Sequence, residues 1–195
     1  MGYHRAGFDV VGVDVNPQPD YPFRFVQADA LAPPFDLSDF DLIHASPPCQ
    51  AYSRAGHLAR AQKKPPKALD LVDATRAVLK ASGVPYVIEN VEGAPLAGAI
   101  RLCGSSFGLG VRRHRLFECS FWMMSPPCQH PRQGRPVGVY HRLGDDVPHG
   151  GKTADTLSEA QEAMGIDWLP WKALKEAIPP AYTEWIGRNI LDPHT

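Results

Sequence analysis

One stretch, Asp39-Phe-Asp-Leu-Ile-His-Ala-Ser-Pro-Pro-Cys-Gln-Ala-Tyr-Ser53, indicates how the chain is organised. Phe40 to Ala45 is a short apolar run stopped by two prolines, which is typical of a buried strand in a parallel sheet. Cys49 follows the carboxyl end of this strand, where open α/β sheets bind ligands. Because Pro47 and Pro48 restrict the backbone before it, the thiol has the fixed position that a nucleophile needs. The alternative is a small core residue, as free cysteines usually are.

Three further apolar runs are predicted strands, and each is followed by an acidic residue. They are Phe8–Val13 with Asp14, Phe23–Gln27 with Asp29, and Pro85–Ile88 with Glu89. Asp14 is placed to accept hydrogen bonds from the hydroxyls of a ribose, and Asp29 from an exocyclic amine such as that of adenine. A role in a turn is the alternative for both residues.

A helix is predicted over Lys67–Ser82, because apolar residues recur there on one face and Gly83 ends the pattern. The order strand, helix, strand is a right-handed crossover that would bring Cys49 and Glu89 to one sheet edge. Later segments are a glycine-rich turn, a strand, an irregular region and three helices. Their ranges are 101–110, the second half of 111–119, 120–151, 156–164, 171–177 and 181–191.

Composition indicates a soluble globular protein. The chain has 195 residues, of which 44% are hydrophobic and 21% charged. No apolar run approaches the ~20 residues that a membrane span needs. Four cysteines in a chain of this length do not form a disulfide scaffold, so we expect reduced thiols and a cytoplasmic protein of a prokaryotic or phage-infected cell. The formal net charge is −1, but arginines cluster between Arg112 and Arg142, which hints at phosphate contacts.

Four motifs occur in an order that resembles the C5-cytosine-specific DNA methyltransferases. They are Ser46-Pro-Pro-Cys-Gln50, Glu89-Asn-Val91, Arg113-His-Arg115, and Ile178-Pro-Pro-Ala-Tyr182. The resemblance implies an α/β fold built on a Rossmann-like S-adenosylmethionine-dependent methyltransferase sheet. It further implies an N-terminally truncated catalytic core over 1–119, a short irregular target-recognition insert over 120–165, and helices over 166–195 that return to the core.

By this resemblance, Cys49 is the nucleophile that adds to carbon 6 of a flipped cytosine, so that carbon 5 takes the methyl group. Glu89 would donate to ring nitrogen 3, while Arg113 and Arg115 would contact the base carbonyl; phosphate or surface pairing is the alternative for both arginines. The residues expected at the S-adenosyl-L-methionine site are Asp14, Asp29, Pro47, Pro48, Tyr182 and Thr183. Those expected on double-stranded DNA are Ser53, Arg54, Arg60, Lys63, Lys64, Arg132 and Arg135.

The sequence departs from the family at its start. The strand and Phe-x-Gly-x-Gly loop that hold the methionine end of the cofactor are expected ahead of Met1-Gly-Tyr-His-Arg-Ala-Gly-Phe8. A misplaced start, a truncated form, or a second chain that supplies the piece would each explain this; we otherwise expect a monomer. An RNA cytosine-5 methyltransferase and a degenerate, non-catalytic DNA-binding or accessory protein are the rival functions.

A second Ser-Pro-Pro-Cys tetrad, Ser125–Cys128, has no strand-to-helix crossover around it, so Cys128 is predicted to be non-catalytic. The residues Cys119, Cys128, His130 and His141 could bind zinc, but their spacing matches no standard finger. We therefore expect no metal.

Overall fold

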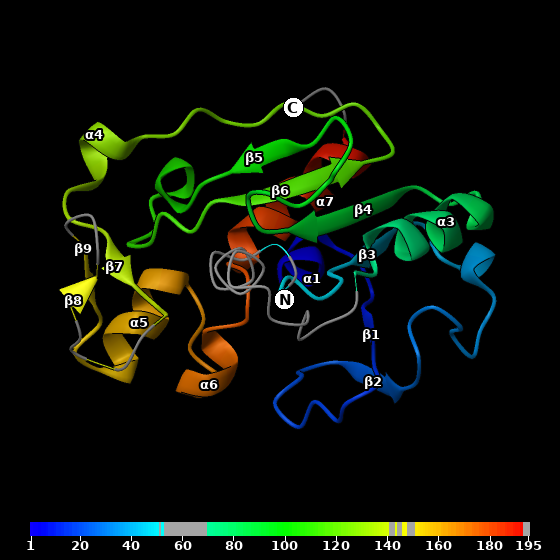
Figure 1. The fold of residues 1–195 in the computed structure, drawn as a ribbon, viewed down its shortest axis with the longest axis horizontal. Coiled ribbons are helices and arrows are strands. Elements are labelled where there is room, and N and C mark those ends of the chain that lie inside the picture. Colours follow the sequence, from blue (N-terminus) through cyan, green and yellow to red (C-terminus); the bar gives the residue numbers. More distant parts are fainter. Residues whose placement is uncertain (51, 53–69, 141–142, 144–145, 148–150, 193–195) are drawn as a thin grey trace, which may run out of the picture.

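The computed structural model describes residues 1–50, 52, 70–140, 143, 146–147 and 151–192 (Figure 1). The predicted DNA contacts Ser53, Arg54, Arg60, Lys63 and Lys64 lie outside the described residues. The fold is mixed α/β, as the sequence predicts. In the described part of the chain, no helix is long and apolar enough to cross a membrane.

The central sheet has the strand order β3-β4-β6-β5. Its strands are β3 (Ile43–Ala45), β4 (Tyr86–Asn90), β5 (Ile100–Leu102) and β6 (Arg115–Cys119). The β3 and β4 strands are parallel, and Ala45 pairs with Ile88. Both other pairings are antiparallel. The carboxyl ends of β3 and β4 therefore lie side by side, as the crossover predicts.

A second, parallel pair joins β1 (Val11–Asp14) to β2 (Arg24–Gln27), with Asp14 opposite Gln27. The sequence predicts one continuous sheet, whereas the described strands of this pair form no ladder with the central sheet. Helix α1 (Gly2–Ala6) contacts the central sheet instead, because Tyr3 Oη lies 2.8 Å from Nδ1 of His44 in β3. The edges of β1 and β3 that face away from β2 and β4 thus have no strand partner among the described residues.

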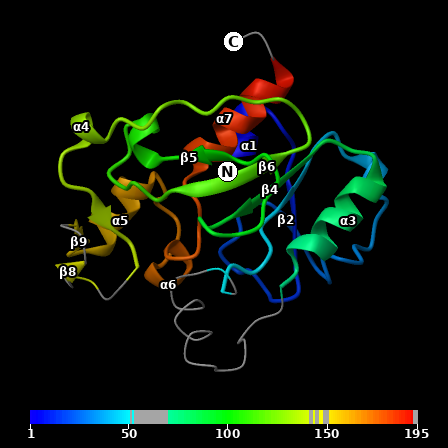
Figure 2. The same ribbon diagram turned by 45° about the horizontal axis from the view of Figure 1, so that its top comes forward.

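Helices cover both faces of the central sheet (Figure 2). Alternate residues of β4 point to opposite faces. Ile88 packs in a cluster with Leu79 of α3 (Val72–Ser82), whereas Val87 packs with Tyr182 of α7 (Pro180–Leu191). The strand is therefore buried along its whole length, which explains the consecutive apolar residues from Tyr86 to Ile88.

Helix α1 packs closely against α7 at two glycines. A β-carbon on Gly2 would lie 2.0 Å from Oγ1 of Thr183, and one on Gly187 would lie 2.8 Å from the β-carbon of Ala6. Any larger residue at either position would push the two helices apart. This contact attaches the N-terminal helix to the body of the protein.

The glycine-rich segment 101–110 is only partly the turn that the sequence predicts. It contains the end of β5 and the 3-10 helix η2 (Gly104–Phe107). A strand of three residues is too short to produce a recognisable alternation of apolar and polar residues in the sequence. A second 3-10 helix, η1 (Leu37–Asp39), precedes β3.

Residues 120–151 contain more secondary structure than the sequence predicts, and the helix predicted over 156–164 is present. A three-stranded sheet has the order β7-β9-β8, formed by β7 (Val137–Gly138), β8 (Asp146–Val147) and β9 (Gly151–Thr153). The helices are α4 (His130–Gln133) and α5 (Leu157–Met164), followed by α6 (Trp171–Leu174). Buried residues of α5 and of the segments beside β7 and β9 form one cluster with Val111, which precedes the region, and Leu174 of α6, which follows it. Residues 120–165 therefore pack onto the segments on either side of them.

Candidate active site

The tip of β4 holds the loop that carries Cys49. Asn90 is buried, and its Nδ2 donates a hydrogen bond to the backbone oxygen of Pro47 at 2.9 Å. The Oδ1 atom of Asn90 accepts from the backbone N–H of Val91 at 2.9 Å. Both ends of the amide are therefore engaged, which fixes the Pro-Pro-Cys backbone beside β4.

Glu89 and Arg115 form a buried ion pair, with Arg115 Nε 3.3 Å from Glu89 Oε1. The two residues lie on neighbouring strands, one at the end of β4 and one at the start of β6. Burial raises the pKa of Glu89 above its usual value, although Arg115 and a hydrogen bond from Ser46 oppose the shift. A carboxyl group in this setting can hold a proton at a higher pH than an exposed one.

Cys49 lies half-buried past the end of β3, close enough to Arg115 to interact with its charge. Its backbone oxygen accepts a hydrogen bond from the N–H of Tyr52 at 3.0 Å. The structure thus brings Cys49, Glu89 and Arg115 to one sheet edge, as the sequence predicts. A thiol that is both held and partly exposed can reach a bound substrate.

Arg113 is buried, which excludes the surface pairing considered from the sequence. Its backbone φ is 37°, a strained value for a residue with a β-carbon. The guanidinium donates from Nη2 to the backbone oxygen of Lys175 at 2.6 Å and lies 5.1 Å from the ring centroid of Tyr140. Its Nε and Nη1 have no hydrogen-bond partner among the described residues. A buried arginine with two unused donor groups is suited to an incoming acceptor.

The two predicted cofactor acids lie at the ends of the separate parallel pair. Asp14 accepts from the backbone N–H of Asn16 at 2.8 Å, and Asp29 from that of Leu31 at 2.9 Å. Both side chains therefore serve turns, the alternative role considered from the sequence. Each carboxylate has further lone pairs, and contact with the cofactor stays a prediction for both.

The other predicted cofactor residues differ in exposure. Tyr182 is fully buried and donates its hydroxyl to the backbone oxygen of Arg113 at 2.9 Å. The Thr183 hydroxyl donates to the Pro180 backbone oxygen at 3.2 Å, within the contact between α1 and α7. Pro47 is buried and Pro48 is exposed. Tyr182 and Thr183 support the site through packing in this structure. Contacts of all four residues with the cofactor stay predictions.

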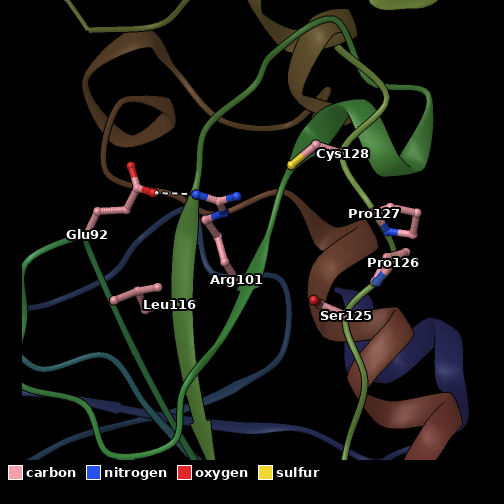
Figure 3. Close-up of a pocket in the computed structure, with 7 residues that line it drawn as sticks. All are labelled: Glu92, Arg101, Leu116, Ser125, Pro126, Pro127 and Cys128. Atoms are coloured by element: carbon pink, nitrogen blue, oxygen red, sulfur yellow. Dashed lines mark hydrogen bonds and ion pairs between the residues drawn. The ribbon is translucent and has the colours of Figure 1, made fainter. Parts of the chain in front are cut away.

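Arg132 and Arg135 are exposed, on and just after α4. An open pocket of about 460 Å³ lies near this segment, and Figure 3 shows the ion pair between Glu92 and Arg101 at its side. Cys128 and the prolines before it line the same pocket, together with Leu116 of β6. The predicted DNA contacts of both arginines remain predictions.

Sequence reasoning missed the supporting residues of the site. Asn90 was part of a recognised motif, yet only its contact with Pro47 reveals what it does. Ser46, which donates to Glu89, also stands inside a quoted motif. The backbone oxygen of Lys175 and the ring of Tyr140 left no signal, because the sequence does not reveal which distant segments meet Arg113.

Comparison with known families bears on this site. The model of the family named C-5 cytosine-specific DNA methylase matches residues 23–95, the segment that contains Cys49 and Glu89. The resemblance read from the sequence is confirmed. The match supports cytosine-5 methyltransferase activity in general. Members of this family generally use S-adenosylmethionine as the methyl donor. No curated protein matches the chain.

Proposed function

We propose that this protein is a DNA cytosine-5 methyltransferase with Cys49 as the nucleophile. The observation that carries the proposal is the gathering of Cys49, the Glu89–Arg115 pair and Arg113 at the end of β3 and β4. The family match over residues 23–95 supports the same reading. We further propose that the two sheets correspond to a Rossmann-like methyltransferase sheet.

The residues have the chemistry that this reaction needs. The Cys49 thiolate forms a bond to carbon 6 of the cytosine, which makes carbon 5 nucleophilic. Glu89 donates a hydrogen bond or proton to ring nitrogen 3 as charge develops there, which its raised pKa favours. The free donors of Arg113 are suited to the base carbonyl. After carbon 5 is methylated, it loses its proton to solvent and the thiolate leaves carbon 6.

The described residues fit the adenosine end of the cofactor. Asp14 and Asp29 have accepting lone pairs at the carboxyl ends of adjacent parallel strands, the position expected for a ribose and an adenine amine. When bound, S-adenosylmethionine supplies an electrophilic methyl group. Among the described residues, no strand pairs with the outer edges of β1 and β3. This supports the further proposal that an additional strand, from residues outside this sequence or from a second chain, joins them.

Double-stranded DNA is the proposed substrate. The exposed Arg132 and Arg135 could contact phosphates, and the target base would have to leave the duplex to reach a half-buried thiol. RNA is the rival substrate. A non-catalytic DNA-binding protein is favoured by one observation, the separation of the two sheets.

Covalent trapping tests the proposal. Duplexes of many sequence contexts carry 5-fluorocytosine, whose fluorine cannot leave as a proton, so the Cys49–carbon 6 bond persists after methyl transfer. We expect an adduct that withstands denaturing electrophoresis, requires S-adenosylmethionine and is lost in Cys49→Ala. Matched single-stranded RNA distinguishes the rival substrate.

Cys119→Ala is the matched control. This thiol lies in β6, and burial raises its pKa to about 12, so it is protonated at neutral pH and should be dispensable. An adduct that survives in Cys49→Ala would reject the assigned nucleophile. The absence of any adduct, both with this chain and with a version extended by a strand and a Phe-x-Gly-x-Gly loop, would favour the binding protein.

A further inference from the structure

Two cysteines and two histidines gather in one place outside the candidate active site. They are Cys103, His114, Cys128 and His130, and their ligand atoms all lie within 4.8 Å of one another. The four residues come from three separate segments. Cys103 follows β5, His114 precedes β6, and the other two belong to the segment that enters α4.

The antiparallel pairing of β5 with β6 brings the first two residues together. Leu102 pairs with Arg115, so one step further along the register places Cys103 opposite His114. The returning chain then brings Cys128 and His130 to the same end of the sheet. Folding of the backbone therefore brings the four side chains together.

Three separations within the cluster lie close to those around one tetrahedral ion. His130 Nε2 lies 3.2 Å from Cys103 Sγ and 3.3 Å from His114 Nε2, and Cys128 Sγ lies 3.7 Å from His114 Nε2. Zinc bonds of about 2.0–2.3 Å at tetrahedral angles would place neighbouring ligands about 3.3–3.8 Å apart. A set of two sulfurs and two nitrogens in this geometry is typical of zinc.

Polar groups behind the cluster orient two of the four side chains. His114 directs Nε2 into the cluster, and its Nδ1 lies 3.6 Å from a carboxylate oxygen of Glu92. Ser105 Oγ lies 3.0 Å from Cys103 Sγ and accepts from the backbone N–H of Gln129 at 3.0 Å. Carboxylates behind histidine ligands, and hydrogen bonds to ligand atoms, are regular features of metal sites.

We propose that Cys103, His114, Cys128 and His130 bind a structural Zn²⁺ ion. Binding releases the two thiol protons to solvent and leaves both histidines neutral, so the charges of the ion and the two thiolates cancel. Four protein ligands leave no open position, as in structural rather than catalytic sites. The proposal revises the expectation of no metal. It keeps Cys128 and His130 from the set considered from the sequence and adds Cys103 and His114, whereas His141 lies outside the described residues.

The ion would also position the candidate active site. His114 stands between Arg113 and Arg115, so its coordination would fix the backbone from which both guanidinium groups extend. Cys128 also lines the open pocket of Figure 3, which gives an ion a route from solvent. The second Ser-Pro-Pro-Cys tetrad would then serve to place a zinc ligand.

Zinc content tests the proposal without reference to methyl transfer. The protein, produced without a histidine tag, is dialysed against a weak chelator and analysed by plasma mass spectrometry. We expect one zinc per chain in the wild type and at least a tenfold loss in Cys128→Ser and His130→Ala. Cys119→Ser removes a thiol outside the cluster and should retain the zinc.

Cobalt titration of the metal-free wild type covers the case in which the variants fail to fold. Binding at the cluster should produce the strong visible absorption of tetrahedral Co²⁺ and a thiolate charge-transfer band, and zinc should abolish both. Wild type that binds neither metal would overturn the proposal. An intact mass lower by two hydrogens, with Cys103 and Cys128 joined as a disulfide, would also overturn it.

Discussion

The side-chain amide of Asn90 and the backbone oxygen of Pro47 are joined by a buried hydrogen bond of 2.9 Å between two neighbouring strand ends. The bond connects the carboxyl end of β4 to the loop that carries Cys49. It also satisfies the backbone oxygen of the buried Pro47, which would otherwise cost free energy. The rigidity of the nucleophile loop should therefore depend on this one side chain.

Asn90→Ala should destabilise the protein by about 1–3 kcal/mol, because it leaves the Pro47 oxygen unsatisfied. The rate of adduct formation should also fall, since Cys49 loses its fixed position. Urea unfolding and trapping kinetics measure the two effects. Asn189→Ala removes a comparable amide, bonded to the Trp185 backbone oxygen within α7, and should leave the trapping rate unchanged. Equal trapping rates in wild type and Asn90→Ala would contradict the role of Asn90.

The second prediction concerns the pH dependence of Glu89. Because burial raises the pKa of this carboxyl, its proton persists to a higher pH, and the trapping rate should fall as pH rises through the raised pKa. The wild-type profile should therefore contain a falling limb at high pH. Glu89→Gln should slow the reaction roughly 100-fold and remove the falling limb. A variant that keeps this limb would show that another group is responsible.

The third prediction concerns an ion pair behind the sheet. Arg76 donates from Nε and Nη2 to the two carboxylate oxygens of Glu118, each at 2.8 Å, and the carboxylate also accepts from the N–H of Ala97. Without Glu118, Arg76 loses its buried partner and keeps only the exposed Asp73 as a counter-charge, so Glu118→Ala should cost up to about 3–5 kcal/mol in urea unfolding. Asp73→Ala, which removes the exposed partner of Arg76, should cost less than about 1 kcal/mol. Similar losses in both variants would contradict this difference.

The fourth prediction concerns stability in acid. Burial lowers the pKa of His44 from 6.5 to about 4 in the folded protein, so the unfolded chain binds more protons between these values. Stability should therefore be fully present above pH 6.5 and decrease as the pH falls towards about 4, by at most about 3 kcal/mol from this residue. Denaturant unfolding across this window checks the expectation. His44→Gln should show a shallower slope, and an unchanged slope would assign the effect to other groups.

The order of elements and the ends of β3 and β4 could be predicted because apolar runs, helix spacing and proline positions are local signals. These signals predict that Cys49 and Glu89 lie at one sheet edge. The zinc candidates could not be grouped in this way. Cys103 lies next to His114 because β5 pairs with β6, and the glycine-rich sequence around β5 does not predict that pairing. Cys128 lies in a region whose sequence has no periodicity, so its position could not be predicted either. Long-range pairing of short strands leaves little trace in one sequence.

Local sequence patterns also could not predict that the described strands form two separate sheets. Apolar runs predict strands, but a run such as Val11–Asp14 does not specify which neighbour it pairs with. The same limit applies to Arg113. It precedes the strand that begins at Arg115 and has a positive φ, which no local pattern in the sequence indicates.

The backbone of Arg113 has an evolutionary consequence. At φ 37°, glycine would relax the main chain, and asparagine would tolerate it better than arginine does. Either replacement would remove the buried guanidinium that reaches Lys175 and Tyr140. Selection for thermal stability should therefore favour glycine at position 113, whereas selection for turnover should favour arginine. A library screened only for thermal survival would be expected to accumulate glycine at this position and to lose methyl transfer as it does so.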